Sequence, residues 1–172
     1  MVKFTLYLNK IIKNQVLNLI GTYHCKADNK GRVMVPADLK KQLAPALAQG
    51  FVVKRAVFQP CLELYPMDQW NALMEKVGRL NQFNRKNNDF TRRFTAGVRR
   101  IELDATGRIN IPADLMTVAH IKHDLVLTAS VCIVEIWDAA KYEQAISDAA
   151  QDFADLAEEV MGTSNNAADE LS

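Results

Sequence analysis

In two very short segments of the chain, residues 33–35 and 109–111, a β-branched apolar residue alternates with a different residue, Met34 in the first and Asn110 in the second. Alternation with a period of two predicts β-strands that have one buried face and one exposed face. Each segment ends at a proline, Pro36 or Pro112, which an Ala-Asp-Leu sequence follows. Because proline fits the end of a strand and the first turn of a helix, each proline predicts a change from strand to short helix.

Longer apolar runs predict four further strands. Residues 51–56 are expected to pair with residues 61–65, and residues 124–129 are expected to pair with residues 131–137. The intervening polar segment 81–89 is rich in asparagine and predicts a linker. The chain therefore has the pattern of a mixed α+β protein, with one strand pair before the linker and one after it.

Three stretches show apolar residues at helical spacing. Asp68 is the expected N-cap of the first, whose apolar stripe comprises Trp70, Leu73, Met74, Val77 and Leu80. The second stripe comprises Phe90, Phe94 and Val98. A last helix is expected to start near Asp138, with one apolar face made of Tyr142, Ala145, Ile146, Ala149, Phe153, Leu156 and Val160.

One pattern of twelve residues occurs twice, beginning at Asp28 and again at Asp104, 76 residues later. Asp, Gly, Arg, Pro, Ala, Asp and Leu recur at the same positions of both copies. An aspartate that starts a tight turn accepts hydrogen bonds from the backbone N–H groups ahead of it, and glycine suits the fourth position. Asp28 with Gly31, and Asp104 with Gly107, are therefore expected to pin the turns of two β-hairpins.

The similarity extends beyond this pattern. Residues 61–65 followed by Trp70 resemble residues 133–137 followed by Tyr142, here 72 residues apart. Self-similarity at a nearly fixed spacing indicates a tandem duplication. The predicted organisation is an N-terminal extension (1–16), a first repeat (17–80), a linker and helix (81–98), a second repeat (99–142), and an acidic C-terminal helix and tail (143–172).

The formal net charge of +1 hides an asymmetry along the chain. Residues 1–141 carry a formal charge of +9, and residues 142–172 carry −8. A basic body permits a polyanionic partner that the net charge alone would not reveal. One basic cluster comprises Arg85, Lys86, Arg92, Arg93, Arg99 and Arg100. It is expected either to extend a surface that faces the polyanionic partner or to pair with the acidic last helix, in the same chain or a neighbouring one.

Patterns typical of enzymes and metal sites are missing from the sequence. The three cysteines have no CxxC spacing, and Cys61 and Cys132 lie in apolar runs, which predicts reduced thiols and favours the cytoplasm. The three histidines do not complete a metal-ligand pattern, and there is no phosphate-binding loop, nucleophile elbow or catalytic triad. No apolar run approaches the roughly 18 residues of a membrane span. We therefore expect no enzymatic activity, metal, cofactor, small-molecule substrate or membrane partner.

The duplicated Asp-x-x-Gly-Arg-x-x-x-Pro block resembles the MraZ family. After the first copy come Cys-Leu-Glu-Leu-Tyr-Pro and a helix headed by Trp70, and the resemblance runs from about Leu17 to Met161. It implies an α+β fold: a pseudo-symmetric double-split β-barrel like those of AbrB and MazE, built from the swapped hairpins of two tandem repeats with flanking helices. It also implies a sequence-specific transcriptional repressor of the cell-division and cell-wall gene cluster. Such a protein is cytoplasmic, associates with the nucleoid, and binds promoter repeats in double-stranded DNA as a homo-oligomeric ring.

The family's Asp-x-x-x-Arg element falls on Asp28 and Arg32, and again on Asp104 and Arg108. The DNA-binding residues expected from this resemblance and from the need for exposed cations are Lys30, Arg32, Lys40, Lys41 and Arg108. The first turn carries Lys30 where the second has Thr106, so the first is expected to bind DNA more strongly.

Two alternatives stay open for these cations. Arg32 and Arg108 are expected to contact DNA, to form ion pairs with the turn aspartates, or to do both. Lys40 and Lys41 are a phosphate-facing pair or a solvated helix face. At the level of function, the alternative to a regulator is an antitoxin-type module that binds a protein partner through the acidic C-terminal arm.

Overall fold

The computed structural model describes residues 17–149 and 152–162. The expected N-terminal extension, residues 1–16, and residues 163–172 of the expected tail lie outside the described residues. The chain divides into two compact units, the first ending at Asp138 and the second beginning at Ala139. The first unit contains both copies of the repeated pattern.

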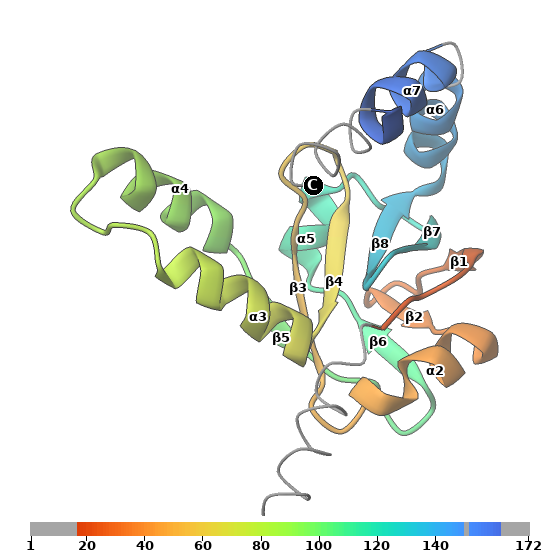
Figure 1. Cartoon of the computed structure of the whole chain (residues 1–172). Helices are drawn as coiled ribbons and strands as arrows, with labels where there is room; N and C mark the ends of the chain where they lie inside the picture. The colour runs from red at the N-terminus through yellow and green to blue at the C-terminus, as the bar shows by residue number, and fades with distance from the viewer. Residues whose placement is uncertain (1–16, 150–151, 163–172) are drawn as a thin grey trace, which may run out of the picture. The chain divides into compact units, whose positions relative to one another are not determined.

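The strands of the first unit form an antiparallel six-stranded sheet and a separate two-stranded ribbon (Figure 1). The order in the sheet is β1-β7-β8-β4-β3-β5, and the ribbon pairs β2 with β6. The sheet strands are β1 (Thr22–Lys26), β3 (Phe51–Arg55), β4 (Leu62–Pro66), β5 (Arg99–Ile101), β7 (Asp124–Ser130) and β8 (Ile133–Asp138). The ribbon strands are β2 (Arg32–Met34) and β6 (Arg108–Asn110).

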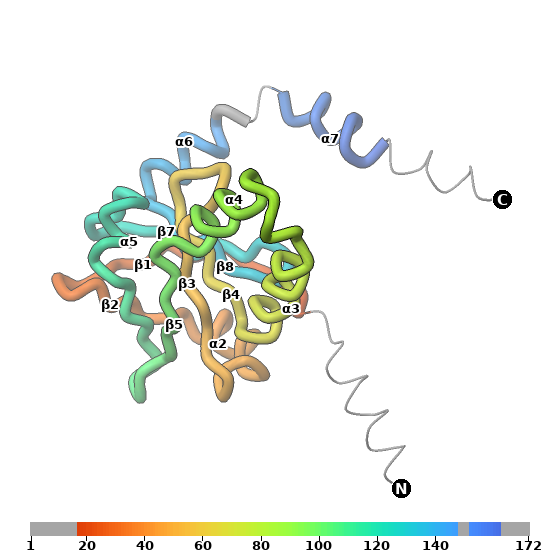
Figure 2. Tube along the Cα trace, turned by 90° about the vertical axis from the view of Figure 1, so that its left-hand side faces the viewer, coloured from red at the N-terminus to blue at the C-terminus, as the bar shows by residue number. Residues whose placement is uncertain are grey.

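The two repeats exchange strands. β1 of the first repeat pairs with β7 of the second, and β5 of the second repeat pairs with β3 of the first (Figure 2). At the middle of the sheet β4 pairs with β8, and Glu63 lies opposite Glu135. Replacing each strand by its counterpart in the other repeat gives the same strand order, read from the opposite edge of the sheet. The fold therefore has a pseudo-twofold relation that matches the duplication in the sequence.

This arrangement confirms the mixed α+β class and revises two of the expectations. The expected hairpins are reduced to contacts beside the turns. In the first repeat these are the Ala27–Val33 bridge and a hydrogen bond from Asp28 N to Arg32 O (3.0 Å), and in the second the matching bond runs from Asp104 N to Arg108 O (2.8 Å). Beyond these contacts β1 pairs with β7 in the sheet and β2 pairs with β6 in the ribbon. Among residues 17–149 and 152–162, the hydrogen-bonded strands close no barrel, because β1 and β5 are the edges of an open sheet.

The main core lies between the sheet and the layer made by the ribbon and two short helices. These helices are α2 (Ala37–Leu43) and α5 (Ala113–Val118), which begin directly after Pro36 and Pro112 as predicted. A 3₁₀ turn, η1 (Ala44–Ala46), continues α2. Side chains from both repeats fill this core, including Val33, Leu39, Phe51, Leu62, Ile109, Leu115, Leu127 and Ile136. Burial of apolar surface from both repeats explains why neither repeat needs a complete core of its own.

Helices α3 (Met67–Gly78) and α4 (Arg85–Thr95) form an antiparallel pair beside β3 and β4 (Figure 1). Trp70 of α3 stacks on Phe94 of α4 at a centroid distance of 6.3 Å, and an aromatic pair of this kind fixes how two helices pack. Trp70, from the predicted stripe, therefore packs α3 against α4.

Helix boundaries in this region differ from the prediction. Pro66 is the N-cap residue of α3, so Asp68 lies in its first turn, where a carboxylate complements the N-terminal dipole. The expected linker is half helical, since Asn84 caps α4 by accepting hydrogen bonds from Lys86 N (2.9 Å) and Asn87 N (3.4 Å). Val98 lies beyond the end of α4, directly before β5.

The second unit contains α6 (Ala139–Ala149) and α7 (Phe153–Gly162). The single last helix predicted from Asp138 onward is therefore two helices in the described residues. No helix in the described part of the chain is long and apolar enough to span a membrane. Cys25, Cys61 and Cys132 are free thiols, of which Cys61 is buried and the other two are partly buried, and burial raises the pKa of Cys61 to about 12.

Candidate nucleic-acid interface

The ribbon presents an exposed face of four side chains. Its register places Arg32 opposite Asn110, Val33 opposite Ile109 and Met34 opposite Arg108. Val33 and Ile109 are fully buried, and side chains alternate between the two faces of a strand. The opposite face therefore displays the other four residues, which are the two arginines, Met34 and Asn110.

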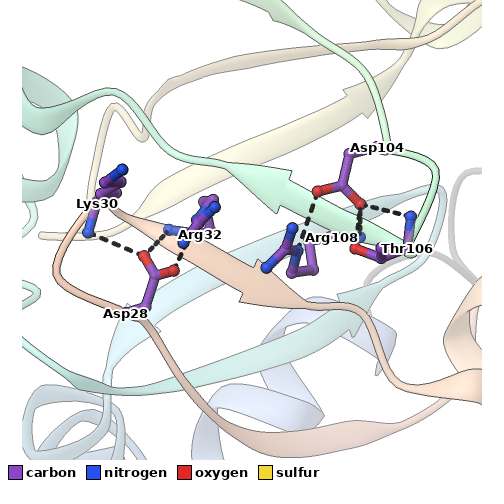
Figure 3. A network of polar contacts seen from close by, with 6 residues as sticks. All are labelled: Asp28, Lys30, Arg32, Asp104, Thr106 and Arg108. Carbon is purple, nitrogen blue, oxygen red and sulfur yellow. Dashed lines mark hydrogen bonds and ion pairs between the residues drawn. The ribbon is translucent and has the colours of Figure 1, made fainter.

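The first turn lies at one end of this ribbon and is organised around the Asp28 carboxylate (Figure 3). Oδ1 accepts hydrogen bonds from Lys30 N (2.9 Å) and Arg32 N (3.0 Å), and Oδ2 accepts one from Arg32 Nε (2.6 Å). Gly31, with φ of 77°, donates its N–H to Asp28 O (3.0 Å). Glycine is favoured here because left-handed backbone costs other L-residues free energy.

The second turn repeats this geometry at the other end of the ribbon (Figure 3). Asp104 Oδ1 accepts hydrogen bonds from Thr106 N (2.9 Å), Thr106 Oγ1 (2.7 Å) and Arg108 N (3.0 Å). Asp104 Oδ2 accepts one from Arg108 Nε at 3.0 Å. Both aspartates therefore accept hydrogen bonds from backbone N–H groups of their own turns, which is the geometry that a turn-pinning role requires.

These hydrogen bonds favour the ionised carboxylates. The Arg32 backbone N–H is the largest cause that lowers the pKa of Asp28 from its ordinary value. The hydroxyl of Thr106 is the largest cause that lowers the pKa of Asp104, which falls well below its ordinary range. A lowered pKa in the folded state adds stability above the unfolded pKa, and this stability is lost as the pH falls through the folded value. Both turns therefore keep their carboxylates charged at neutral pH.

Ion pairing leaves the ends of both guanidinium groups available. Nε is the one guanidinium atom of Arg32 and of Arg108 that bonds to the aspartate, and within the described residues no hydrogen bond engages the Nη atoms. The side chains are 37% and 31% exposed, so these atoms lie at a surface that a partner can reach. The two readings of the arginines are thus compatible, because the aspartate orients a guanidinium whose outer N–H donors remain free for an anion or a base edge.

Each turn is attached to the other repeat by backbone hydrogen bonds. Val35 N donates to Gly107 O (3.1 Å), and Ile111 N donates to Gly31 O (2.9 Å). The glycine carbonyl at each tip is therefore held by the strand of the opposite repeat. These hydrogen bonds hold both turns on the same ribbon. The distance between the turns therefore depends on contacts between the two repeats.

Helix side chains also cross from one repeat to the turn of the other. Lys40 Nζ, on α2 of the first repeat, lies 3.1 Å from the position that a Cβ atom of Gly107 would occupy. Met116, the equivalent residue on α5, places Sδ 2.9 Å from the corresponding position at Gly31. The tip charges are therefore equal: the first combines an aspartate with Lys30 and an arginine, and the second combines an aspartate with Lys40 and an arginine.

This placement gives the second tip a cation that comes from outside its turn, and the stronger DNA binding expected of the first tip stays a prediction. It also distinguishes two lysines that the sequence treated as a pair. Lys40 and Lys41 are both exposed and form no ion pair among the described residues, but Lys40 lies beside Gly107. Sequence reasoning passed over Met34, Asn110 and Met116. The sequence does mark these residues in one way: they occupy positions of the repeat where the two copies have different residues.

The basic cluster around α4 has acidic partners within the first unit. Ion pairs join Arg92 and Arg93 to Asp89, at 3.8 and 3.2 Å. Two further pairs are Arg99–Asp114 at 3.5 Å and Arg100–Glu102 at 3.7 Å. All of these arginines are more than half exposed, so the ion pairs leave them hydrated and contribute little stability.

The described residues contain no group of three His, Cys, Asp or Glu side chains that could hold a metal ion. The chemistry of the ribbon face is that of anion and hydrogen-bond recognition, through two fixed guanidinium groups, two lysines and an amide. No side chain at this face has the geometry of a nucleophile activated by a neighbouring base.

Comparison with known proteins agrees with the duplicated geometry. The family model described as "MraZ protein, putative antitoxin-like" matches residues 19–93 and again residues 94–163. Three similar proteins, each named "Transcriptional regulator MraZ", come from Christiangramia forsetii, Flavobacterium psychrophilum and Cytophaga hutchinsonii. The first is 62% identical over 147 residues, which cover 86% of this chain and 95% of the relative.

The second is 60% identical over 148 residues, covering 86% of this chain and 94% of the relative. The third is 35% identical over 141 residues, covering 82% and 93%. Two tandem family matches, relatives aligned along most of their length, and two copies of the Asp-x-x-x-Arg turn on one ribbon lead to the same conclusion: this chain belongs to the MraZ family.

Proposed function

We propose that this protein is a DNA-binding transcriptional regulator that contacts duplex DNA with the exposed face of the β2–β6 ribbon. One observation carries the proposal: Arg32 and Arg108 are each held at Nε by an aspartate and keep their Nη donors free on the same exposed face. The names of the similar proteins, all transcriptional regulators, support it.

The ribbon has suitable dimensions for this task. Two paired strands lie about 4.8 Å apart, and a major groove about 12 Å wide admits a two-stranded ribbon. An arginine with two free N–H donors can bond guanine O6 and N7 or bridge phosphate oxygens. Lys30 and Lys40, at the two tips, are placed to contact phosphates on either side of the groove.

Replacing Arg32 or Arg108 by alanine is expected to weaken binding to duplex DNA from the region upstream of the protein's own gene by about 5- to 150-fold each. The expected cause is loss of the guanidinium donors on the ribbon face. Fluorescence anisotropy with labelled duplex across a salt series measures both the affinity and the slope of log K against log[salt]. Each variant is expected to show a slope reduced by about 1 if its arginine contacts a phosphate.

Arg79→Ala provides a matched control, since Arg79 is the C-cap residue of α3, pairs with Glu75 at 2.6 Å and is far from the ribbon strands in the sequence. It is expected to bind as the wild type does. Wild-type affinity in Arg32→Ala and Arg108→Ala would overturn the proposal, and would leave both arginines as residues that only pin their turns.

Lys40→Met gives a separate prediction about the second tip. The substitution puts at position 40 the residue found at the equivalent position 116, and it removes the cation beside Gly107. We expect the salt slope to fall by about 1 and binding to weaken for specific and unrelated duplexes alike, because a phosphate contact carries no sequence information.

Lys41→Met is the control for that experiment, because it removes an equal charge from the adjacent, exposed position of the same helix. Met116→Lys tests the converse and is expected to strengthen binding by adding a cation at the first tip. Equal effects of Lys40→Met and Lys41→Met would show that only the net charge of α2 matters.

The finer features of this function are also proposals. We propose a repressor of the cell-division and cell-wall gene cluster, cytoplasmic and nucleoid-associated, in which the sheet and ribbon correspond to the halves of a double-split β-barrel. Assembly into a homo-oligomeric ring would present several ribbons to repeated promoter boxes, which raises avidity without new contacts. Enrichment of the upstream duplex over an unrelated one, together with light scattering on the free protein, tests the target and the assembly.

A second candidate function follows from the family description, which contains the words "antitoxin-like". A protein-interaction module would bind its partner through apolar surface, and its affinity would respond little to salt. DNA binding through Z phosphates instead gives a slope of about −0.9Z. The salt series above therefore separates the two functions.

A further inference from the structure

The exposed face of the ribbon contains an asparagine whose role is not explained by the turn geometry. Asn110 is exposed on β6, directly opposite Arg32 and two residues after Arg108 on the same face. Its side-chain amide makes no hydrogen bond among the described residues, in contrast to the arginines on either side. An unpaired carboxamide between two oriented guanidinium groups is a free recognition element.

We propose that Asn110 reads an adenine in the major groove and determines which base pair the ribbon accepts beside the arginine contacts. The proposal rests on the DNA-binding function proposed above and extends it to a specificity-determining residue. An asparagine amide matches adenine on two points, since it can donate to N7 and accept from the N6 amino group. The other bases present different patterns at these positions.

The strand register explains why Asn110 can reach a base. β6 is held at both ends of the ribbon, by Val35 N to Gly107 O and by Ile111 N to Gly31 O. Asn110 lies between these anchors, and its Oδ1 is 3.7 Å from the position that a Cβ atom of Gly31 would occupy. Its place on the face is therefore fixed by backbone contacts, and it shares that face with the residues expected to enter the groove.

The duplication supplies an internal comparison. Met34 occupies the equivalent position of the first repeat, is 53% exposed, and lies opposite Arg108. A methionine has no donor or acceptor that matches a base edge, although it can contact the methyl group of thymine. Without the difference between Met34 and Asn110, the two strands would end in the same exposed residue. Because they differ, the exposed face of the ribbon has a polar residue, Asn110, at one of these positions and an apolar residue, Met34, at the other.

The experiment uses the full-length protein and the duplex upstream of its own gene, with each A·T pair replaced in turn by G·C. The wild type is expected to lose about 5- to 150-fold in affinity at one adenine position or more. Asn110→Ala is expected to lose this discrimination while keeping its salt slope. Replacing the same adenine by 7-deazaadenine, which lacks N7, is expected to weaken the wild type and leave the variant unaffected.

Asn110→Asp makes the test independent of any loss of stability. A carboxylate only accepts hydrogen bonds and matches the N4 amino group of cytosine, so this variant is expected to prefer cytosine at the position where the wild type prefers adenine. Met34→Ala is the control for a change on the same face and is expected to keep the adenine preference. Thermal melts verify that all three variants are folded.

Two results would overturn the assignment of Asn110. One is an unchanged profile of base preference in Asn110→Ala, and the other is a reduced salt slope, which would make Asn110 a backbone contact. Failure of the underlying function gives a different outcome, in which the wild type shows no preference for any duplex and Arg32→Ala binds as tightly as the wild type.

Discussion

Replacing Glu63 by alanine is expected to lower the free energy of unfolding by about 3–5 kcal/mol, because it leaves a buried charge without its partner. Lys54 is only 1% exposed, and its Nζ lies 2.8 Å from Glu63 Oε2 and 2.6 Å from Arg55 O. The ammonium also lies 4.5 Å from the centre of the Phe94 ring. Loss of the carboxylate removes the only acidic partner that the structure records for this lysine.

The same substitution affects a second group. Tyr65 donates its hydroxyl to Glu63 Oε2 at 3.0 Å, and burial, followed by the charge of Glu63, raises the pKa of the Tyr65 hydroxyl well above its ordinary value. In Glu63→Ala this half-buried hydroxyl loses its acceptor, which adds to the cost. Chemical denaturation followed by circular dichroism measures the change in unfolding free energy.

Glu135→Ala is the matched control, since Glu135 lies opposite Glu63 on β8 and bonds Trp137 Nε1 at 2.8 Å. Glu135 lies opposite the neutral Thr128 on β7, whereas Glu63 lies opposite Lys54 on β3. We expect a cost of about 1 kcal/mol or less, because removing one of two facing carboxylates also relieves repulsion. Equal losses of unfolding free energy in the two variants would show that the buried ion pair stabilises the fold no more than the Glu135 contact does.

Gly31→Ala is expected to destabilise the protein by about 2–4 kcal/mol, from left-handed strain and from overpacking. Gly31 has φ of 77°, and a Cβ atom there would lie 2.6 Å from Ile111 O. That oxygen belongs to the backbone of the opposite repeat and cannot move without disturbing the adjacent hydrogen bond from Ile111 N to Gly31 O. The substitution therefore damages the first tip and the ribbon together.

Gly107→Ala separates strain from steric conflict. Gly107 has a similar φ of 81°, but the nearest atom to its added Cβ is Lys40 Nζ at 3.1 Å, the end of a flexible side chain. The expected loss is about 1–2 kcal/mol from the backbone conformation alone. Thermal and chemical unfolding of the two variants give the comparison. A loss in Gly107→Ala as large as that in Gly31→Ala would contradict the role assigned to the Ile111 carbonyl.

The sequence predicts the local elements of this fold well, because each depends on neighbouring residues. Pro36 and Pro112 mark the starts of α2 and α5, and the paired runs around residues 51–65 and 124–137 are strands. The start of α4 was missed since a polar, asparagine-rich segment resembles a linker. Asn84 instead accepts two backbone N–H bonds and starts the helix.

Strand exchange could not be derived from the pattern of residues. Alternation determines which face of β1 is buried, but β3 and β7 offer it similar apolar edges, one in each repeat. The choice between them depends on the packing of the whole unit. For the same reason the position of Lys40 beside Gly107 escaped prediction, because it follows from contacts between repeats.

The candidate site was predicted in part. The turns and their Asp–Arg contacts follow from spacing alone, since partners four residues apart across a tight turn are necessarily close. Asn110 and Met34 require the register of β2 against β6, which brings together residues far apart in the sequence. A recognition surface shared between two repeats is visible only once the pairing of their strands is known.

The pairing of β1 with β7 also has a consequence for synthesis of the protein on the ribosome. Thr22 and Thr128 are hydrogen-bonded across a separation of 106 residues, so β1 leaves the ribosome long before its partner exists. At about 5–20 residues per second, the delay lasts roughly 5 to 20 seconds. During that time β1 remains an unpaired strand, and the nascent first repeat cannot complete its sheet until the second repeat has been translated.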